Sequence, residues 1–283
     1  MKIRQEYEQF INEKFAGQAR ELLLKNVKLY YQENIDVKKN KYKVGDSVFL
    51  KKGSFIHGLG GSPDSYNNFK IFDYVCENGF IGGDFNDRPT VKILNSVGMW
   101  NIKKDMYLKN YIQLYSGVTV KYRVGDRERG LTDYYELVPY GKIEERFIEL
   151  NNEPDVWSAE QTKEVRFVPS LFSDKNQIAF ILNMESDYAK EVSKQDVWNP
   201  EYRTEEIMKY FCSKYFLPEM LEGDFNAATT DRESAIMFGI TPRLIEGVLV
   251  GRKIENDEDA LNYIKSKLPE CYVCNLDGIV IKK

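Results

Sequence analysis

The spacing of apolar residues along the chain predicts a helical N-terminus followed by mixed strands and helices. Over residues 1–33 the apolar positions recur every three or four residues, which is the period of one helix face. They are Phe10, Ile11, Phe15, Ala19, Leu22, Leu23, Val27 and Leu29. We interpret residues 1–45 as a helical extension that caps the fold, with a partner-binding helix as the alternative.

Two short apolar runs and an amphipathic helix come next. Residues 47–50 and 54–57 have the composition of strands, and their closeness predicts a hairpin-like pair. Residues 68–78 have helical spacing, with Phe69 among the apolar residues of the inner side. Gly79 follows at the position where a helix commonly ends on a left-handed residue, so we expect the helix to stop there.

The rest of the chain continues the mixture of strands and helices. Strands are predicted over 115–122, 166–172, 177–182, 234–238, 245–250 and 278–281, and helices over 205–215 and 257–268. Residues 124–160 are charged and polar, and we interpret them as a surface excursion. The sum is a mixed α+β fold in which residues 46–283 form one domain after the N-terminal extension.

Composition limits the classes of protein that the chain can be. The formal net charge is −4, so no overall basic field attracts nucleic acid. Lysines at 38–43 and 51–52 offer a local basic groove, although we favour ordinary solvated loops there. No apolar run reaches the ~18–20 residues of a membrane helix, and no secretion leader is seen. We therefore expect a cytoplasmic protein without a membrane partner, with leaderless secretion as the alternative.

The four cysteines do not form a recognisable metal or redox site. Cys271 and Cys274 are a single C-x-x-C pair without a nearby histidine, whereas a tetrahedral zinc site needs four ligands. A redox pair normally opens a helix after a strand, and we interpret this pair as two semi-buried cysteines. Cys76 and Cys212 are predicted on apolar helix faces, with no histidine to activate them. We expect no bound metal.

His57 is the only histidine of the chain, and it ends the apolar run Phe55-Ile56-His57-Gly58. The glycine-rich segment that follows, residues 59–63, first suggests the oxyanion loop of an α/β-hydrolase. That fold also needs a nucleophile elbow and a later catalytic histidine, and the sequence has neither. The glycines allow a ligand close to the backbone, but their spacing matches neither a Walker motif nor a dinucleotide fingerprint.

The His57 segment and a late segment that begins at Glu233 together resemble the ADP-ribosyltransferase superfamily. In that family a strand ending in His-Gly leads to a helix with an Asn-Phe-x-x-Ile type of pattern and a Gly-aliphatic stop. The matching positions are His57-Gly58, Asn68-Phe69-Lys70-Ile71-Phe72 and Gly79-Phe80-Ile81. Late in the family, a catalytic glutamate opens a strand that a proline turn and a second strand follow. Glu233 and the segment from Pro242 to Val250 have this order and spacing.

The resemblance implies an ADP-ribosyltransferase-like split β-sheet core, similar at a distance to poly(ADP-ribose) polymerase-like and DarT-like members. The segment from Val168 to Phe180 looks like the corresponding stretch of the DNA-modifying, DarT-like members. At the position where their pattern has an arginine, this chain has Lys175, which favours a protein target over DNA.

The resemblance also implies that NAD+ is consumed as a substrate, with no metal. Glu233 takes the role of the catalytic carboxylate, and its rival Glu246 is expected on the exposed face of its strand. His57 hydrogen-bonds a ribose hydroxyl, and Gly58 presents its backbone to the nicotinamide amide. The other implied NAD+-binding residues are Asn68, Phe69, Tyr111, Ser173 and Lys175. Among them, Phe69 or Tyr111, or else Tyr66, stacks on the nicotinamide, and Lys175 or Arg166 contacts the pyrophosphate.

The function implied is mono-ADP-ribosylation of a macromolecule, with release of nicotinamide, as in a toxin, effector or defence enzyme. The target is a protein or a nucleic acid, and an antitoxin or immunity protein is a candidate partner. Two alternatives keep the fold, namely an NAD+ glycohydrolase and an RNA 2′-phosphotransferase. A third is a non-enzymatic binding module that uses the N-terminal helices and residues 124–160.

Overall fold

The structure is a computed structural model that describes most of the 283-residue chain. The described residues are 2–59, 69–81, 96–115, 117–126, 130–139, 142, 145–146, 148–149, 166–169, 178–196, 199–202, 204–207 and 233–283. Helices and strands are interspersed along them, so the chain has the mixed α+β fold that the sequence predicts.

The α-helices are α1 (Lys2–Lys14), α2 (Gly17–Tyr30), α3 (Phe69–Asn78), α4 (Leu108–Tyr115), α6 (Asp187–Ser193) and α8 (Glu258–Lys267). Two 3-10 helices are η5 (Pro200–Tyr202) and η8 (Pro242–Leu244). The first strands are β1 (Phe49–Leu50), β2 (Phe55–Gly58), β3 (Phe80–Ile81), β4 (Ser96–Asn101), β5 (Met106–Tyr107), β6 (Gly117–Asp126) and β7 (Gly130–Pro139). The others are β8 (Arg166–Pro169), β9 (Ile178–Leu182), β10 (Glu233–Met237), β11 (Gly239–Ile240), β12 (Ile245–Val250), β13 (Tyr272–Cys274) and β14 (Val280–Lys282).

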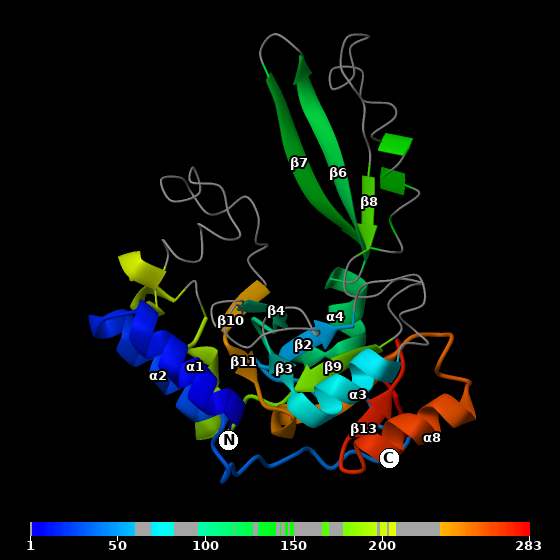
Figure 1. Ribbon diagram of the computed structural model, residues 1–283. Coiled ribbons are helices and arrows are strands. Elements are labelled where there is room, and N and C mark those ends of the chain that lie inside the picture. The colour runs from blue at the N-terminus through cyan, green and yellow to red at the C-terminus, as the bar shows by residue number, and fades with distance from the viewer. Residues whose placement is uncertain are drawn as a thin grey trace.

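The core is a seven-stranded sheet with the order β10-β4-β2-β9-β12-β13-β14 (Figure 1). β12 and β13 run parallel, and all other neighbours in this sheet are antiparallel. Every residue of β9 and β12 is buried. Continuous burial of this kind requires cover on both faces of the sheet, which explains why β9 is an unbroken apolar run.

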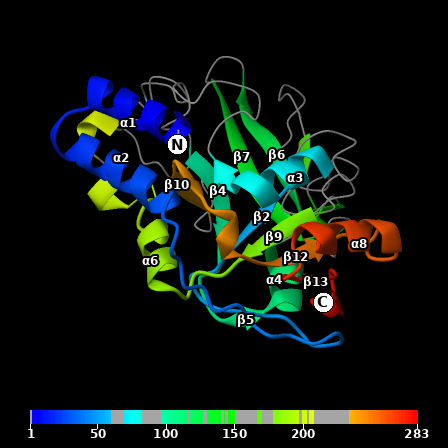
Figure 2. The ribbon, with the colours of Figure 1, turned by 60° about the horizontal axis from the view of Figure 1, so that its bottom comes forward.

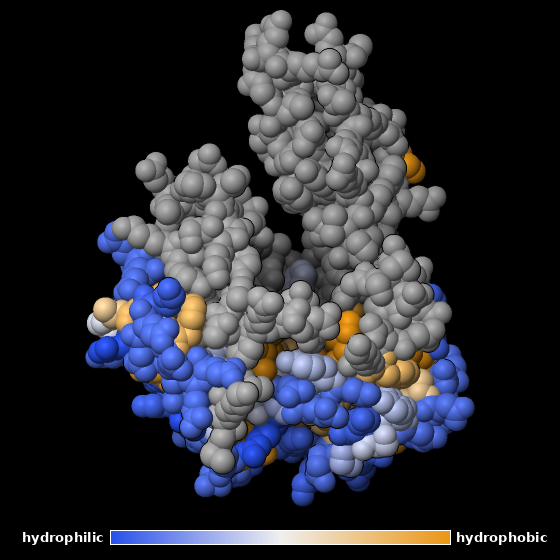
Figure 3. All heavy atoms as spheres, viewed as in Figure 1, coloured by the Kyte–Doolittle hydropathy of each residue, from blue (hydrophilic) through white to orange (hydrophobic). Residues whose placement is uncertain are grey.

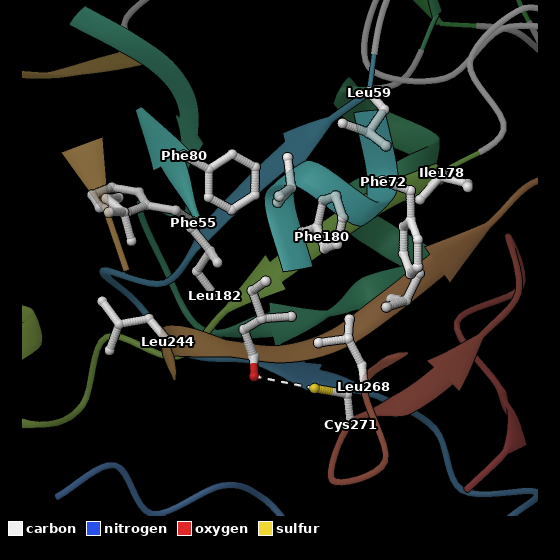
Figure 4. Packing of buried hydrophobic residues seen from close by; sticks show 14 of the residues in the cluster. Phe55, Leu59, Phe72, Phe80, Ile178, Phe180, Leu182, Leu244, Leu268 and Cys271 are labelled. Atoms are coloured by element: carbon white, nitrogen blue, oxygen red, sulfur yellow. Dashed lines mark hydrogen bonds between the residues drawn. The ribbon is translucent and has the colours of Figure 1, made fainter. Parts of the chain in front are cut away.

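Helices cover the two faces of the sheet. On one face α3 and α8 contribute Phe72 and Ile264 to a large apolar cluster that includes Phe180 of β9. Phe72 and Phe180 stack with their ring centroids 5.6 Å apart, and Figure 4 shows them at the centre of this cluster. On the other face α4 packs through Tyr111 in a cluster that contains Ile56 of β2. The faces of β2 therefore belong to two separate cores.

The N-terminal helices pack on the end of β10, as a cap would. The buried apolar residues of α1, α2 and the turn between them recur every three or four positions and are Tyr7, Ile11, Phe15, Ala19, Leu23 and Val27. These residues share an apolar cluster with Met237 and Phe238. Phe238 has a φ of 70°, which is rare for a residue with a large side chain, and its ring meets that of Tyr7 edge-on at 4.7 Å. The packing of aromatic rings around Phe238 holds this unfavourable backbone conformation.

The predicted hairpin of residues 47–50 and 54–57 does not form. β1 pairs with β5, with Phe49 opposite Tyr107, whereas β2 lies between β4 and β9 in the main sheet. A turn closed by the bond from the Ser54 amide to the Lys51 carbonyl takes the chain from one sheet to the other. The pairing partners are distant in sequence, so local composition does not reveal them.

Part of the predicted surface excursion over 124–160 is regular β structure. β6 and β7 form an antiparallel hairpin from Gly117 to Pro139, and β8 pairs with the other edge of β6. This three-stranded sheet projects from the body of the molecule (Figure 1). The strand predicted over 115–122 therefore continues further than expected, and α4 precedes it as a helix that the sequence did not predict.

Several local predictions are confirmed. α3 ends at Asn78, and Gly79 has a φ of 72° with its amide bonded to the carbonyl of Val75. Of the helix predicted over 205–215, only the first residues are described, and they are helical.

Within the described ranges no helix is long and apolar enough to cross a membrane. The described part of the surface in Figure 3 is mostly hydrophilic.

Candidate active site

His57 lies where β2 separates from β4. Two residue pairs join β2 to β4, and the last of them is Ile56 with Trp100. β2 stays paired with β9 for two further residues, to Gly58, and β4 stays paired with β10 as far as Ser96. The sheet therefore opens between β2 and β4 from His57 onward. The imidazole spans this opening, because its Nδ1 lies 3.0 Å from the carbonyl oxygen of Gly98 on β4.

This bond determines which nitrogen of the His57 ring can accept a hydrogen bond. A carbonyl oxygen only accepts, so Nδ1 carries the proton that it donates to Gly98, and the neutral ring has an acceptor at Nε2. Burial lowers the pKa of His57 to about 4, against the opposing effect of the Gly98 bond. The ring also packs against Phe80, with centroids 4.7 Å apart. His57 is therefore a fixed, neutral acceptor near pH 7.

The strand of Glu233 is the outer neighbour of β4, on the side away from β2. Glu233 is the first residue of β10, as predicted, and it pairs with Trp100, which in turn pairs with Ile56. Adjacent strands lie ~4.8 Å apart, so the backbone of Glu233 is about 10 Å from that of Ile56. Directly paired residues share one face of a sheet, so position 233 is on the face of Ile56, whereas His57 belongs to the other face. The side chain of Glu233 is outside the described part of the structure.

The other predicted NAD+-binding residues fall into three groups. Phe69 begins α3 and packs edge-on against Tyr263, with ring centroids 4.6 Å apart. Tyr111 is 1% exposed and lies in the cluster of Ile56, on the face of β2 opposite to His57. The structure does not bring Tyr111 to His57, and its expected role at the nicotinamide is dropped. The residues Tyr66, Asn68, Ser173 and Lys175 and the side chain of Arg166 lie outside the described residues.

Glu246 is not on an exposed face, contrary to the expectation. It is 5% exposed, at an irregularity in the pairing of β12 with β9. The Asn40 amide donates to its Oε1 at 2.7 Å, and the Tyr272 hydroxyl lies 3.5 Å from the same atom. Burial raises the pKa of the Glu246 carboxyl, while these bonds lower it. The irregular pairing breaks the alternation on which the prediction relied, and Glu246 is a buried structural carboxylate.

The cysteines with described positions, Cys76, Cys271 and Cys274, are free thiols. Cys271 and Cys274 are fully buried rather than semi-buried, and Cys271 donates to the carbonyl of Ile245 at 3.2 Å (Figure 4). Burial raises the pKa of both thiols, and it raises that of Cys76 to about 12. Thiols with raised pKa values are poor nucleophiles and poor metal ligands. The described residues contain no group of acidic, histidine and cysteine side chains that could hold a metal ion.

A cavity that the sequence did not predict lies at Ser234, on the face of the sheet that carries Phe55. It has a volume of about 650 Å³, and its lining includes Lys52, Phe55, Asn101, Glu185 and Ser234. Asn101 donates to the hydroxyl of Ser234 at 3.1 Å, and Ser234 is 2% exposed. The volume lies within the range of sites for small molecules. Asn101 belongs to β4, a strand with no predicted pattern, so only the register of β4 with β10 places it here.

Comparisons with protein families, with curated proteins and with solved structures each find no match for this chain. Evidence for a function therefore comes only from the α+β fold and from the positions of His57 and of the strand that begins at Glu233.

Proposed function

We propose that this chain is an NAD+-dependent mono-ADP-ribosyltransferase with an ADP-ribosyltransferase-like split-sheet core. One observation carries the proposal. His57 and Gly58 stand where β2 and β4 separate, and Glu233 opens the strand on the other side of β4. Both segments of the family resemblance, although 176 positions apart in the sequence, thus lie in neighbouring parts of one sheet.

The reaction proposed breaks the bond between nicotinamide and C1 of the ribose. Nicotinamide leaves with the bonding electron pair, and positive charge develops on the ribose in an oxocarbenium-like transition state. The Glu233 carboxylate stabilises this charge and polarises the attacking group. An oxygen or nitrogen of the acceptor then bonds to C1, and its proton is lost to the carboxylate or to water.

His57 and Gly58 position the substrate in this scheme. The neutral imidazole accepts a hydrogen bond from a ribose hydroxyl at Nε2, while its Nδ1 is held by Gly98. A ring fixed at one nitrogen loses little freedom when the other binds, so the contact is preorganised. Gly58 has no side chain to block the approach of the nicotinamide amide to the backbone.

The test is incubation with labelled NAD+ and a cell lysate, followed by measurement of nicotinamide and of labelled macromolecules. Glu233→Gln should abolish labelling, with circular dichroism unchanged from the wild type. Glu246→Gln is the matched control, because the new amide keeps an acceptor for Asn40 and lies away from the reaction. Full labelling by Glu233→Gln would refute the assignment of the catalytic carboxylate.

The same experiment separates transfer from hydrolysis. Chromatography that finds free ADP-ribose equal to the nicotinamide released identifies an NAD+ glycohydrolase instead. Calorimetry that detects no NAD+ binding would favour the non-enzymatic binding module.

A further inference from the structure

Two surface segments, residues 41–52 and 103–109, collect positive charge in an acidic protein. They pair through β1 and β5 and lie along the lower edge of Figure 2. Together they contain seven lysines and no arginine against two aspartates, although the net charge of the whole chain is −4. We call residues 41–52 and 103–109 the lysine-rich surface. All of its lysines are exposed, and they are Lys41, Lys43, Lys51, Lys52, Lys103, Lys104 and Lys109.

The two aspartates leave most of this positive charge uncompensated. Within the described residues, the one ion pair formed by these lysines joins Lys51 to Asp105 at 4.0 Å, between half-exposed side chains. An exposed pair of this kind contributes little stability. Asp105 also accepts a hydrogen bond from the Lys52 backbone amide at 2.7 Å, and Asp46 accepts one from the Lys43 amide at 2.7 Å. The aspartates thus order turns of the backbone, and the lysines remain available to an anionic partner.

The same surface presents apolar side chains to solvent. The exposed large hydrophobic residues among those described are Val44, Tyr107 and Ile148, and the first two lie here. Val44 is 63% exposed and Tyr107 is 52% exposed. The Tyr107 ring packs edge-on against Phe49 of β1, with ring centroids 5.1 Å apart. Positive charge and apolar side chains are therefore combined on one surface.

Hydrogen bonds hold the turn over residues 43–46, which presents the exposed valine, in a fixed arrangement. Gly45 has a φ of 94°, and its amide donates to the carbonyl of Val280 in β14 at 2.8 Å. Just before the turn, the Tyr42 hydroxyl accepts from the amide of Phe49 and donates to the carbonyl of the same residue, both at 3.1 Å. The surface therefore needs little ordering when it binds a partner, which favours affinity.

An anionic lipid bilayer fits this combination better than a nucleic acid does. Lipid phosphates and carboxylates attract a group of lysines, and the headgroup region accepts the apolar stems of lysines together with aliphatic and tyrosine side chains. A single-stranded nucleic acid stacks its bases on aromatic rings, which leaves the aliphatic Val44 without a role. Phosphates of nucleic acids are preferentially recognised by the forked guanidinium of arginine, and this surface has no arginine.

We propose that the lysine-rich surface binds an anionic bilayer, with Val44 and Tyr107 entering the headgroup region. Charge and a small apolar contact act together in such binding, because one weak signal alone does not hold a protein at a membrane. The contact is peripheral and requires no spanning helix. The expectation of no membrane partner followed from the lack of a spanning segment, so it does not bear on a contact of this kind. The inference is independent of the transferase function proposed above.

Binding is measured by co-sedimentation with vesicles of phosphatidylcholine alone and of phosphatidylcholine mixed with phosphatidylserine. The wild type should bind only the mixed vesicles, and more weakly as salt is added. Each lysine near an anionic surface contributes about fivefold in affinity, so Lys103→Glu with Lys104→Glu should bind about 25-fold more weakly or worse. The matched control, Lys14→Glu with Lys28→Glu on the exposed surface of α1 and α2, makes the same change in charge and should bind like the wild type.

The apolar contact has variants of its own. Val44→Ser should weaken binding by about threefold or more and leave the salt dependence unchanged, because serine removes apolar area but no charge. Tyr107→Ser should act in the same direction. Ile148→Ser is the matched control, because Ile148 is 57% exposed but lies outside the lysine-rich surface. The substituted side chains are exposed, so all of these variants should melt like the wild type.

The outcomes separate this inference from its rivals. Glu233→Gln should bind the mixed vesicles like the wild type, so failure of the transferase proposal leaves this test intact. A wild type that ignores the mixed vesicles at low salt, or lysine variants that bind as well as their control, would overturn the proposal. Loss of binding in the lysine variants alone, with Val44→Ser and Tyr107→Ser unchanged, would overturn the apolar contact. A single-stranded oligonucleotide that displaces the protein from the vesicles and binds it more tightly would identify a nucleic-acid surface instead.

Discussion

Acidification is expected to destabilise the protein through His57, which holds the only imidazole of the chain. Burial lowers the pKa of His57 from 6.5 to about 4 in the folded state. The unfolded chain takes up this proton near pH 6.5, whereas the folded chain remains neutral until about pH 4. The contribution of the neutral ring to stability is thus fully present above pH 6.5 and is lost as the pH falls to 4.

The size of the effect follows from the same two pKa values. Within this window, the free energy of unfolding falls by at most about 1.4 kcal/mol per pH unit for one proton. Between pH 6.5 and pH 4.5 the loss is therefore at most about 3 kcal/mol, and hydration of the partly exposed ring makes it smaller. Below the folded pKa both states carry the proton, so the contribution of His57 no longer changes.

A single histidine makes the assay direct. Proton NMR of the one imidazole C2–H should give a titration midpoint between pH 4 and 5 in the folded protein. Urea unfolding of the wild type and His57→Asn at pH 7, 6 and 5 should give profiles that converge as the pH falls. The asparagine amide retains a donor for the carbonyl of Gly98 but does not titrate, so the comparison cancels the carboxylates. A midpoint of 6 or above, or two parallel profiles, would refute the argument from burial.

Three further changes test the packing around the site. Gly79→Ala should lower the free energy of unfolding by more than about 2 kcal/mol, because a Cβ at this φ of 72° would lie 2.2 Å from the carbonyl oxygen of Ile240; a wild-type urea midpoint would contradict this. Phe238→Ala should cost about 3–5 kcal/mol and make α1 and α2 the first sites of trypsin cleavage, since three tyrosine rings surround this side chain; an unchanged cleavage pattern would count against it. Glu246→Leu should have a free energy of unfolding about 0.5–1.5 kcal/mol below that of Glu246→Gln, because leucine removes the acceptor of the Asn40 amide and this exposed residue bonds to water instead; equal melting temperatures would show that the bond contributes nothing.

Local signals predicted the elements that carry the site. The apolar run that ends at His57 is β2, the helix before Gly79 is α3, and the strand predicted at Ser234 begins at Glu233. These predictions succeed because side-chain periodicity and the conformational freedom of glycine act within a few residues.

The neighbours of each element were not predictable in this way. The expected hairpin partner of residues 47–50 was wrong, because β1 pairs with β5 more than fifty residues later. The same limit hid the burial of Glu246, which depends on an irregular strand pairing and on Asn40 from the segment before β1. Burial and pairing are properties of several segments together, and no single segment contains them.

The sequence by itself determined that one histidine and a strand-opening glutamate are available, and which short segments present them. Only the tertiary structure decided that β4 stands between those segments, that the sheet opens beside His57, and that Tyr111 belongs to the opposite face. The physical reason is the alternation of side chains in a strand, which divides residues between two faces but does not say what covers either face. Strand order and register, set by long-range packing, supply that information.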